Sequence, residues 1–230
     1  MRRFYKRVGI SESEQGHAVL LDGRPVRTPA GNGLMFSSRA LAEAIAAEWE
    51  AQEKEIKPHT MPLMRLASMA LDHVAASREK IIAEVLNYAA TDLLCYRVKE
   101  PATLAERQAE AWQPLLDWAG ERYGASLTVT EWLAAVDQPA TSLAALEMAM
   151  GQLDDLRLAA LWDCASLCHS LILGLALLEG EIGAERAWEI SQLDESFQIE
   201  RWGSDEEAER RRETLRADLL AVERFLSLRR

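Results

Sequence analysis

The feature that most constrains this chain is a long apolar stretch between residues 153 and 178. Its large apolar side chains fall on nearly every side of a helix with 3.6 residues per turn, not along one stripe. Such a helix must be surrounded by other helices, so the stretch predicts the central member of a helical bundle. The residues that define it are Leu156, Leu158, Leu161, Trp162, Leu167, Leu171, Ile172, Leu175 and Leu178.

This stretch is typical of a core helix and not of a membrane span. A bilayer requires about 20 consecutive apolar residues. The longest strongly apolar run without charge, from Cys164 to Leu178, is shorter and is interrupted by Ser166, His169 and Ser170. The basic amino terminus is followed by no apolar run of the kind that marks a secretory signal. We therefore expect a cytoplasmic protein that does not insert into membranes.

The first sixty residues have a different pattern. Short β-type runs flank Asp22-Gly23, a dipeptide that supplies the positive φ angles of a type I′ hairpin turn. A helix is predicted over residues 39–53, because Leu41, Ile45 and Trp49 recur on one face. This part of the chain predicts a small antiparallel sheet with one helix packed on it.

Helical periodicity covers the rest of the chain. In addition to the 153–178 helix, we expect helices near residues 63–75, 78–90, 103–123, 140–151, 184–201 and 205–228. Pro58 and Pro62 force extended backbone before each of them, so we place a domain boundary there. The predicted fold class is α+β: a small antiparallel β-rich domain with one helix over residues 1–58, followed by an all-α bundle over residues 59–230.

Charge and cysteine content exclude several classes of protein. The chain has 26 Lys and Arg against 37 Asp and Glu, a net charge of −11, which argues against binding to nucleic acid or anionic membranes. Three cysteines indicate no disulfide framework and fit a reducing compartment. Cys164, Cys168 and His169 lie close together, but zinc requires four ligands and nothing nearby completes the set. We expect no metal and no cofactor.

One polar group near the carboxyl end stands out. Glu195, Gln198 and Trp202 share a helix face, and Asp194 precedes them. Adjacent carboxylates serve as acid–base groups or magnesium ligands, but they also occur on ordinary solvated helices. A carboxylate–amide–indole face equally suits protein recognition, in which tryptophan anchors are enriched. Composition and spacing leave these alternatives open and provide no convincing catalytic constellation.

Several stretches, all in the same order, resemble the ATP synthase F1-complex assembly factor 2 family, the assembly chaperones of the alpha subunit. They include LDGRPVRTPAG at residues 21–31 and DESFQ at residues 194–198. The full set covers residues 21–31, 46–52 with 56–58, 60–67, 88–97, 112–119, and 191–198 with 202–205. The resemblance therefore extends over essentially the whole chain.

The resemblance implies an amino-terminal β-rich domain, a carboxyl-terminal orthogonal helical bundle and a non-enzymatic role. Such a protein binds the unassembled alpha subunit, prevents its aggregation and releases it to the beta subunit. Mitochondrial members carry targeting extensions, whereas this chain begins almost directly at the first strand. We therefore expect a bacterial cytoplasmic relative, and a monomer in its free state.

The resemblance also points to an acidic residue in the Asp-Glu-x-x-Gln motif. That role falls on Glu195, with Asp194 as the second candidate, and Gln198 and Trp202 complete the predicted partner-binding face. The alternative is a small metal-dependent hydrolase that uses Asp194, Glu195 and Asp205. A third alternative is an interaction module with a different client.

Overall fold

The computed structural model describes residues 1–131 and 136–229, and the chain falls into two compact units. Unit 1 consists of Met1–Arg78, Asp155–Ala160 and Ala221–Arg230, and unit 2 consists of Glu79–Asp154 and Leu161–Leu220. Both units therefore draw on segments that are far apart in the sequence. The predicted boundary between residues 58 and 59 stays a prediction.

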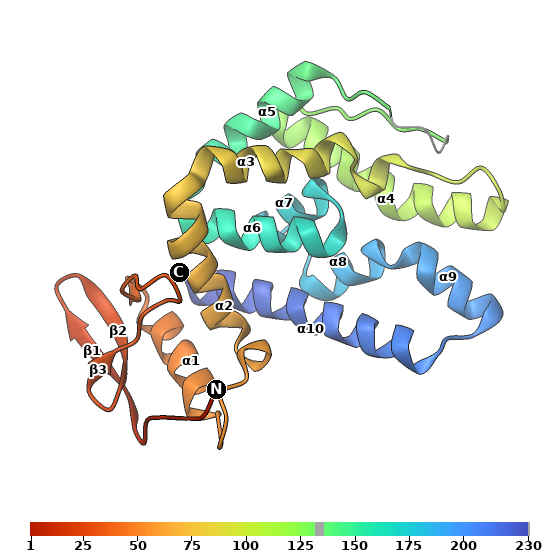
Figure 1. The fold of residues 1–230 in the computed structure, drawn as a ribbon. Helices are drawn as coiled ribbons and strands as arrows, with labels where there is room; N and C mark the ends of the chain where they lie inside the picture. Colours follow the sequence, from red (N-terminus) through yellow and green to blue (C-terminus); the bar gives the residue numbers. More distant parts are fainter. Residues whose placement is uncertain (132–135, 230) are drawn as a thin grey trace. The chain divides into compact units, whose positions relative to one another are not determined.

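Unit 1 contains a small antiparallel sheet (Figure 1). Its strands are β1 (Val8–Ser13), β2 (Gly16–Leu21), β3 (Arg24–Pro25) and β4 (Met35–Phe36), and β2 pairs with each of the others. Asp22 and Gly23 join β2 to β3 with φ angles of 49° and 81°. Positive φ at both positions is the geometry that a type I′ turn requires, as the Asp-Gly dipeptide predicted.

Helix α1 (Arg39–Glu50) packs against this sheet, as Figure 1 shows in orange beside the red strands. Leu41, Ile45 and Trp49, the face predicted from the sequence, are all buried. Ser38 begins the helix, and its hydroxyl oxygen accepts a hydrogen bond from the Leu41 N–H at 3.4 Å. The α+β fold class is therefore confirmed.

The remaining segments around α1 are helical. They comprise the 3₁₀ turn η1 (Pro58–Thr60), α2 (Pro62–Met69) and a π-helical turn η2 (Ala70–Val74), which leads into α3 (Ala75–Ala90). Glu48 on α1 caps α2: its carboxylate accepts hydrogen bonds from the Leu63 and Met64 N–H groups at 2.8 and 2.9 Å. These bonds satisfy donors that a helix start leaves without intrahelical partners.

Unit 2 is built from helices. After the 3₁₀ turn η3 (Leu93–Cys95) come α4 (Ala102–Tyr123), α5 (Ala140–Gly151), α6 (Asp155–Cys168), α7 (Leu171–Glu179), α8 (Ala184–Ser191), α9 (Leu193–Trp202) and α10 (Glu206–Leu228). The first residues of α6 and the last of α10 belong to unit 1. Over the described part of the chain, no helix is both long and apolar enough to span a membrane.

The apolar stretch is buried, as predicted, but it is not one helix. No surface is exposed on Leu161, Leu171, Ile172 and Leu173. The helix is interrupted between α6 and α7 at His169, whose φ is 52°. Ser170 then caps α7, because its hydroxyl oxygen accepts the Leu173 N–H at 3.0 Å. The expectation of a continuous helix over 153–178 is therefore wrong.

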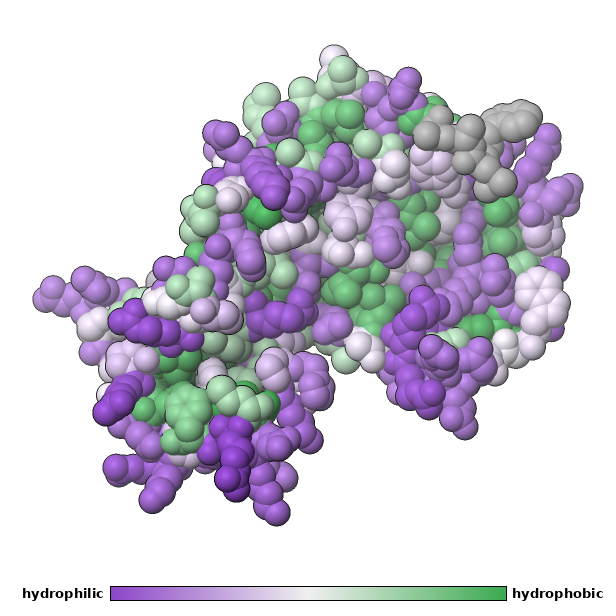
Figure 2. Space-filling model, in the orientation of Figure 1, coloured by the Kyte–Doolittle hydropathy of each residue, from purple (hydrophilic) through white to green (hydrophobic). Residues whose placement is uncertain are grey.

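A second predicted helix is also divided. The expected helix over residues 184–201 is α8 followed by α9, and Gln192 between them has the non-helical angles φ −103° and ψ 15°. Hydrophilic residues cover most of the face shown in Figure 2, in keeping with the strong net charge. The break at Gln192 also marks the start of α9, the helix that carries the predicted site residues.

Candidate functional site

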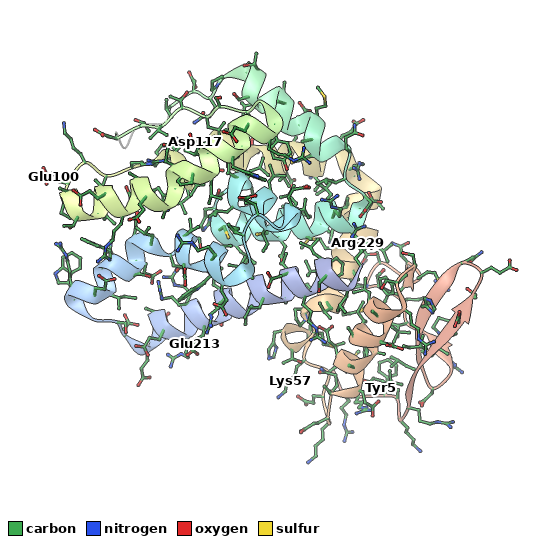
Figure 3. All side chains as sticks on the ribbon, turned by 180° about the vertical axis from the view of Figure 1, so that it is seen from behind. Tyr5, Lys57, Glu100, Asp117, Glu213 and Arg229 are labelled. Carbon is green, nitrogen blue, oxygen red and sulfur yellow. The ribbon has the colours of Figure 1, made fainter. Side chains whose placement is uncertain are left out.

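The four predicted site residues lie on α9, which runs beside the unit 2 portion of α10 (Figure 3). Phe197 is the buried anchor of α9, with 4 % of its surface exposed. The guanidinium carbons of Arg107 and Arg201 lie 5.3 and 4.2 Å from the centroid of its ring. Cation–π contacts of this kind stabilise an aromatic side chain between charged neighbours. Phe197 thereby fixes which side of α9 faces outward.

Asp194 points toward the interior of unit 2. Its Oδ1 accepts a hydrogen bond from the Gln108 side-chain amide at 2.7 Å, and Gln108 is itself fully buried on α4. Desolvation raises the pKa of the Asp194 carboxyl, and the bond from Gln108 opposes that rise. Gln108 also accepts the Val98 N–H at 2.9 Å. Asp194 therefore connects α9 to α4, and its carboxylate is engaged by the Gln108 amide.

Glu195 faces α10. Its Oε1 accepts a hydrogen bond from Arg211, and its Oε2 lies 3.6 Å from Nη1 of Arg212. About a quarter of the Glu195 side chain is exposed, whereas Arg212 is mostly covered and also donates to the Ser196 hydroxyl at 2.8 Å. Glu195 is therefore paired with two positive charges: Arg212, which is largely buried, and Arg211, which is exposed to solvent.

Gln198 and Trp202 are exposed on α9, one helical turn apart. Trp202 has 76 % of its surface in contact with solvent. Tryptophan is among the residues most enriched as anchors of protein–protein interfaces. We call Glu195, Gln198 and Trp202 the α9 face. The structure brings these three together and turns Asp194 inward.

The metal-dependent hydrolase is not favoured. Asp205 begins α10, where its Oδ1 accepts the N–H groups of Glu207 and Ala208 at 2.9 and 2.8 Å. Asp194 and Glu195 are committed to Gln108 and to arginines. Within residues 1–131 and 136–229, no three His, Cys, Asp or Glu side chains gather as metal ligands would.

Sequence reasoning missed the partners of these residues. Arg211 and Arg212 belong to the run Arg210-Arg211-Arg212 in an otherwise acidic segment, a signal that pointed to a nearby carboxylate. The role of Gln108 left no comparable trace, because a lone glutamine on a predicted helix looks like a solvated residue.

Comparison with known proteins shows which proteins the chain is similar to. The family described as ATP12 chaperone protein matches residues 2–120. The mitochondrial protein atp12 of Schizosaccharomyces pombe is 26 % identical over 219 residues, which is 90 % of this chain and 75 % of that protein. The crystal structure of Atp12 from Paracoccus denitrificans is 44 % identical, with a TM-score of 0.91 over 100 % of this chain and 98 % of the other. An aspartate-to-lysine mutant of that protein matches equally well.

The fold and these relatives define the class as an assembly chaperone of ATP synthase. The chain belongs to the ATP12 chaperone family. Membership in a chaperone family favours a non-enzymatic role.

Proposed function

We propose that this protein binds the unassembled alpha subunit of ATP synthase, keeps it from aggregating and releases it to the beta subunit. It acts in the cytoplasm, as a monomer and without a cofactor. The α9 face is its contact surface: Trp202 supplies the apolar anchor, Gln198 an adaptable hydrogen-bonding group, and Glu195 a carboxylate for a polar or cationic group of the client.

The observation that carries this proposal is the combination of exposed Trp202 with partly exposed Glu195 on the same helix. An isolated exposed tryptophan provides affinity but little orientation. A neighbouring carboxylate adds a directional contact, and Arg211 is exposed enough to swing away when a client group takes its place. Charged groups at the edge of an apolar contact favour specificity and reversible binding.

Release is the second requirement. A standard protein–protein interface buries about 1,600 Å², but the quality of its anchors decides the affinity and not its area. A face with one aromatic anchor and a solvated ion pair suits moderate affinity, so the beta subunit displaces the chaperone. The strong negative charge of unit 2, 11 Lys and Arg against 26 Asp and Glu, supports solubility of the captured complex.

The test is co-expression of the alpha subunit with the wild-type chain or with the Trp202→Ala variant, followed by measurement of soluble alpha subunit. We expect wild type to keep the alpha subunit soluble and Trp202→Ala to lose most of this effect. Met148→Ala is the matched control, because Met148 is 69 % exposed on α5 of the same unit. It should behave as wild type.

Addition of purified beta subunit to the complex tests release. The alpha subunit should leave the chaperone and co-purify with beta. The proposal fails if the wild-type chain does not keep the alpha subunit soluble. The role of the α9 face fails if Trp202→Ala and Met148→Ala both act like wild type.

A further inference from the structure

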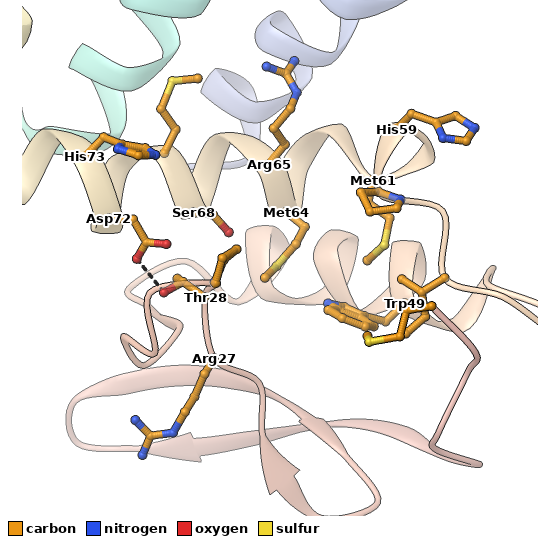
Figure 4. Close-up of a pocket in the computed structure, with 15 residues that line it drawn as sticks. Arg27, Thr28, Trp49, His59, Met61, Met64, Arg65, Ser68, Asp72 and His73 are labelled. Carbon is orange, nitrogen blue, oxygen red and sulfur yellow. Dashed lines mark hydrogen bonds between the residues drawn. The ribbon is translucent and has the colours of Figure 1, made fainter.

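Unit 1 holds a groove of about 590 Å³ between α1, the η1–α2 segment and the loop at residues 27–29. Trp49, Ile56, Met61 and Met64 form its apolar interior, and each is at least nine-tenths buried. Figure 4 shows Met64 pointing into the space from α2, Met61 from the position just before α2, and Trp49 closing it from α1. Strongly exposed Met1 lies at its edge. We call this space the unit 1 groove.

The choice of side chains fits an adaptable binding surface. Methionine is unbranched and polarizable, so it adjusts to different apolar partners, and methionine-rich surfaces recur in proteins that bind varied peptides. Figure 2 shows hydrophobic residues gathered over unit 1 in the region of α1, with hydrophilic residues around them. An apolar area bordered by polar residues marks a site of interaction.

Trp49 adds a specific polar requirement. Its indole Nε1 is buried and, among the described residues, has no hydrogen-bond partner. The rest of the residue is well held: the ring packs edge-on against Tyr5 at 5.7 Å, and the Tyr5 hydroxyl donates to the Trp49 carbonyl at 2.6 Å. Figure 4 shows the indole nitrogen turned toward the cavity. Because buried donors are nearly always paired, this one points to an acceptor supplied by a ligand.

The charge around the groove indicates which ligand. Arg27 and His59 are exposed lining residues, whereas Arg65 and His73, which also line the groove, already interact with other residues of the chain. Of the described lining residues, Asp72 alone carries a carboxylate, and it is already engaged: it accepts hydrogen bonds from the Thr28 hydroxyl, the Asn32 amide and the Ala30 N–H. Arg27 therefore gives the rim an exposed positive charge, which complements a negatively charged group of a ligand.

The whole of unit 1 has the same bias. It contains 15 Lys and Arg against 11 Asp and Glu, a net charge of +4, whereas unit 2 has a net charge of −15. The overall charge of −11 conceals this division. A segment that is apolar and carries an acidic residue is attracted to unit 1 and repelled by unit 2.

We propose that the unit 1 groove binds an extended apolar peptide segment with an acidic residue at its end. Apolar side chains enter between Met61 and Met64, a main-chain carbonyl accepts the Trp49 indole N–H, and the acidic residue meets the basic rim. This inference rests on the proposed function, since the segment belongs to the unassembled client, but it assigns a second contact on a different unit.

The probe is a capped fluorescent peptide, Gly-Leu-Val-Leu-Val-Glu-Glu, whose binding to the full chain is followed by fluorescence anisotropy. A second peptide has two lysines in place of the glutamates. We expect saturable binding of the acidic peptide and much weaker binding of the lysine peptide.

Two variants locate the contact. Trp49→Phe keeps the ring and removes the N–H, so it should weaken binding about fivefold. Trp188→Phe is the matched control, because the Trp188 Nε1 is also buried without a described partner but lies in unit 2. It should leave peptide affinity unchanged. Arg27→Glu alters an exposed rim residue, and it should weaken binding of the acidic peptide about threefold while favouring the lysine peptide.

Three results would overturn the inference. One is that the acidic peptide does not bind. Another is that Trp49→Phe binds the acidic peptide as tightly as Trp188→Phe does. If Trp49→Phe does not fold, the corresponding result is that Arg27→Glu leaves the preference for the acidic over the lysine peptide unchanged. The third is a dimer, seen by sedimentation velocity, that excludes the peptide, because a second copy then occupies the groove. Peptide binding without effect on alpha-subunit solubility would instead remove the proposed function and leave the groove standing.

Discussion

The Asp92 carboxylate, fully buried in unit 2, accepts a hydrogen bond from the Ile172 N–H at the start of α7, at 3.1 Å. It also accepts the Leu94 N–H at 3.1 Å. One acidic side chain thus ties η3 to the break in the apolar stretch. Desolvation raises the pKa of Asp92 to about 6, and the hydrogen bonds from Ser170 and from backbone N–H groups limit the rise.

This burial predicts a pH dependence of stability. Because the folded-state pKa of Asp92 is raised, the folded chain binds this proton more tightly than the unfolded chain. Protonation of Asp92 therefore contributes roughly 3 kcal/mol to the free energy of unfolding. This contribution is fully present below about pH 4 and is lost as the pH rises through about 6. Urea unfolding of wild type and of Asp92→Asn at each pH isolates the contribution of Asp92. The other carboxyl groups are the same in both proteins, so their contributions cancel in the difference. A difference between the two that stays constant from pH 4 to 7 contradicts the prediction.

A second prediction concerns Glu195. Glu195→Gln removes the charge and keeps the shape, so the unfolding free energy should fall by less than about 1 kcal/mol, as for other partly exposed ion pairs. Binding of the alpha subunit should weaken roughly tenfold, because a client cation loses its counter-charge. Isothermal titration calorimetry measures this. Arg211→Gln is the paired variant and should keep binding, since it leaves the carboxylate free. A well-folded Glu195→Gln chain with wild-type affinity would rule out direct contact.

A third prediction concerns the cap that Glu48 provides for α2. Glu48→Gln replaces one accepting oxygen with an amide that faces a backbone N–H, so we expect a loss of about 1–3 kcal/mol in the free energy of unfolding. Glu43→Gln, an exposed position on the same helix with an i,i+4 pair to Arg39, should change it by about 0.5 kcal/mol or less. Equal effects in the two variants would show that the Glu48 bonds contribute little.

A fourth prediction tests the packing of α6 on α7. A Cβ at Gly174 would lie 2.9 Å from the Leu161 Cδ1 and 3.4 Å from the Ala165 nitrogen. Gly174→Ala should therefore destabilise the protein by about 1–3 kcal/mol. Gly151→Ala, at the end of α5 with no atom within 4 Å of the new Cβ, should be neutral or stabilise slightly. Thermal unfolding of both variants should give shifts of opposite sign, or a shift for Gly174→Ala alone.

The local rules of sequence explain most of the fold. The Asp22-Gly23 turn, the buried face of α1 and the α+β division follow from turn chemistry and periodicity. The broken helices do not. The break falls at His169 and Ser170, two of the polar residues in the 153–178 run, but single polar residues of this kind also occur inside continuous helices and do not by themselves predict a break. The division of unit 1 among three segments is likewise set by long-range contacts that no local pattern reveals.

The arrangement of the candidate site residues was predicted only in part. Helical spacing placed Glu195, Gln198 and Trp202 together, and the resemblance selected them. Spacing did not indicate that Asp194 turns inward to Gln108, because that depends on α4, more than eighty residues earlier. The sequence did not predict the unit 1 groove, because Trp49 and the methionines have the pattern of ordinary core residues.

The discontinuity of unit 1 bears on how the protein is made. Ser38, which caps α1, donates its hydroxyl hydrogen to the carbonyl of Leu228, and Arg78 pairs with Asp155 at 2.6 Å. Domains usually fold in order as they emerge during synthesis. Here the sheet and α1 are translated long before residues 155–160 and 221–229, which belong to the same unit. Unit 1 is therefore completed only after residues 221–229 have been translated, so a chain that stops before them has an unfinished unit 1.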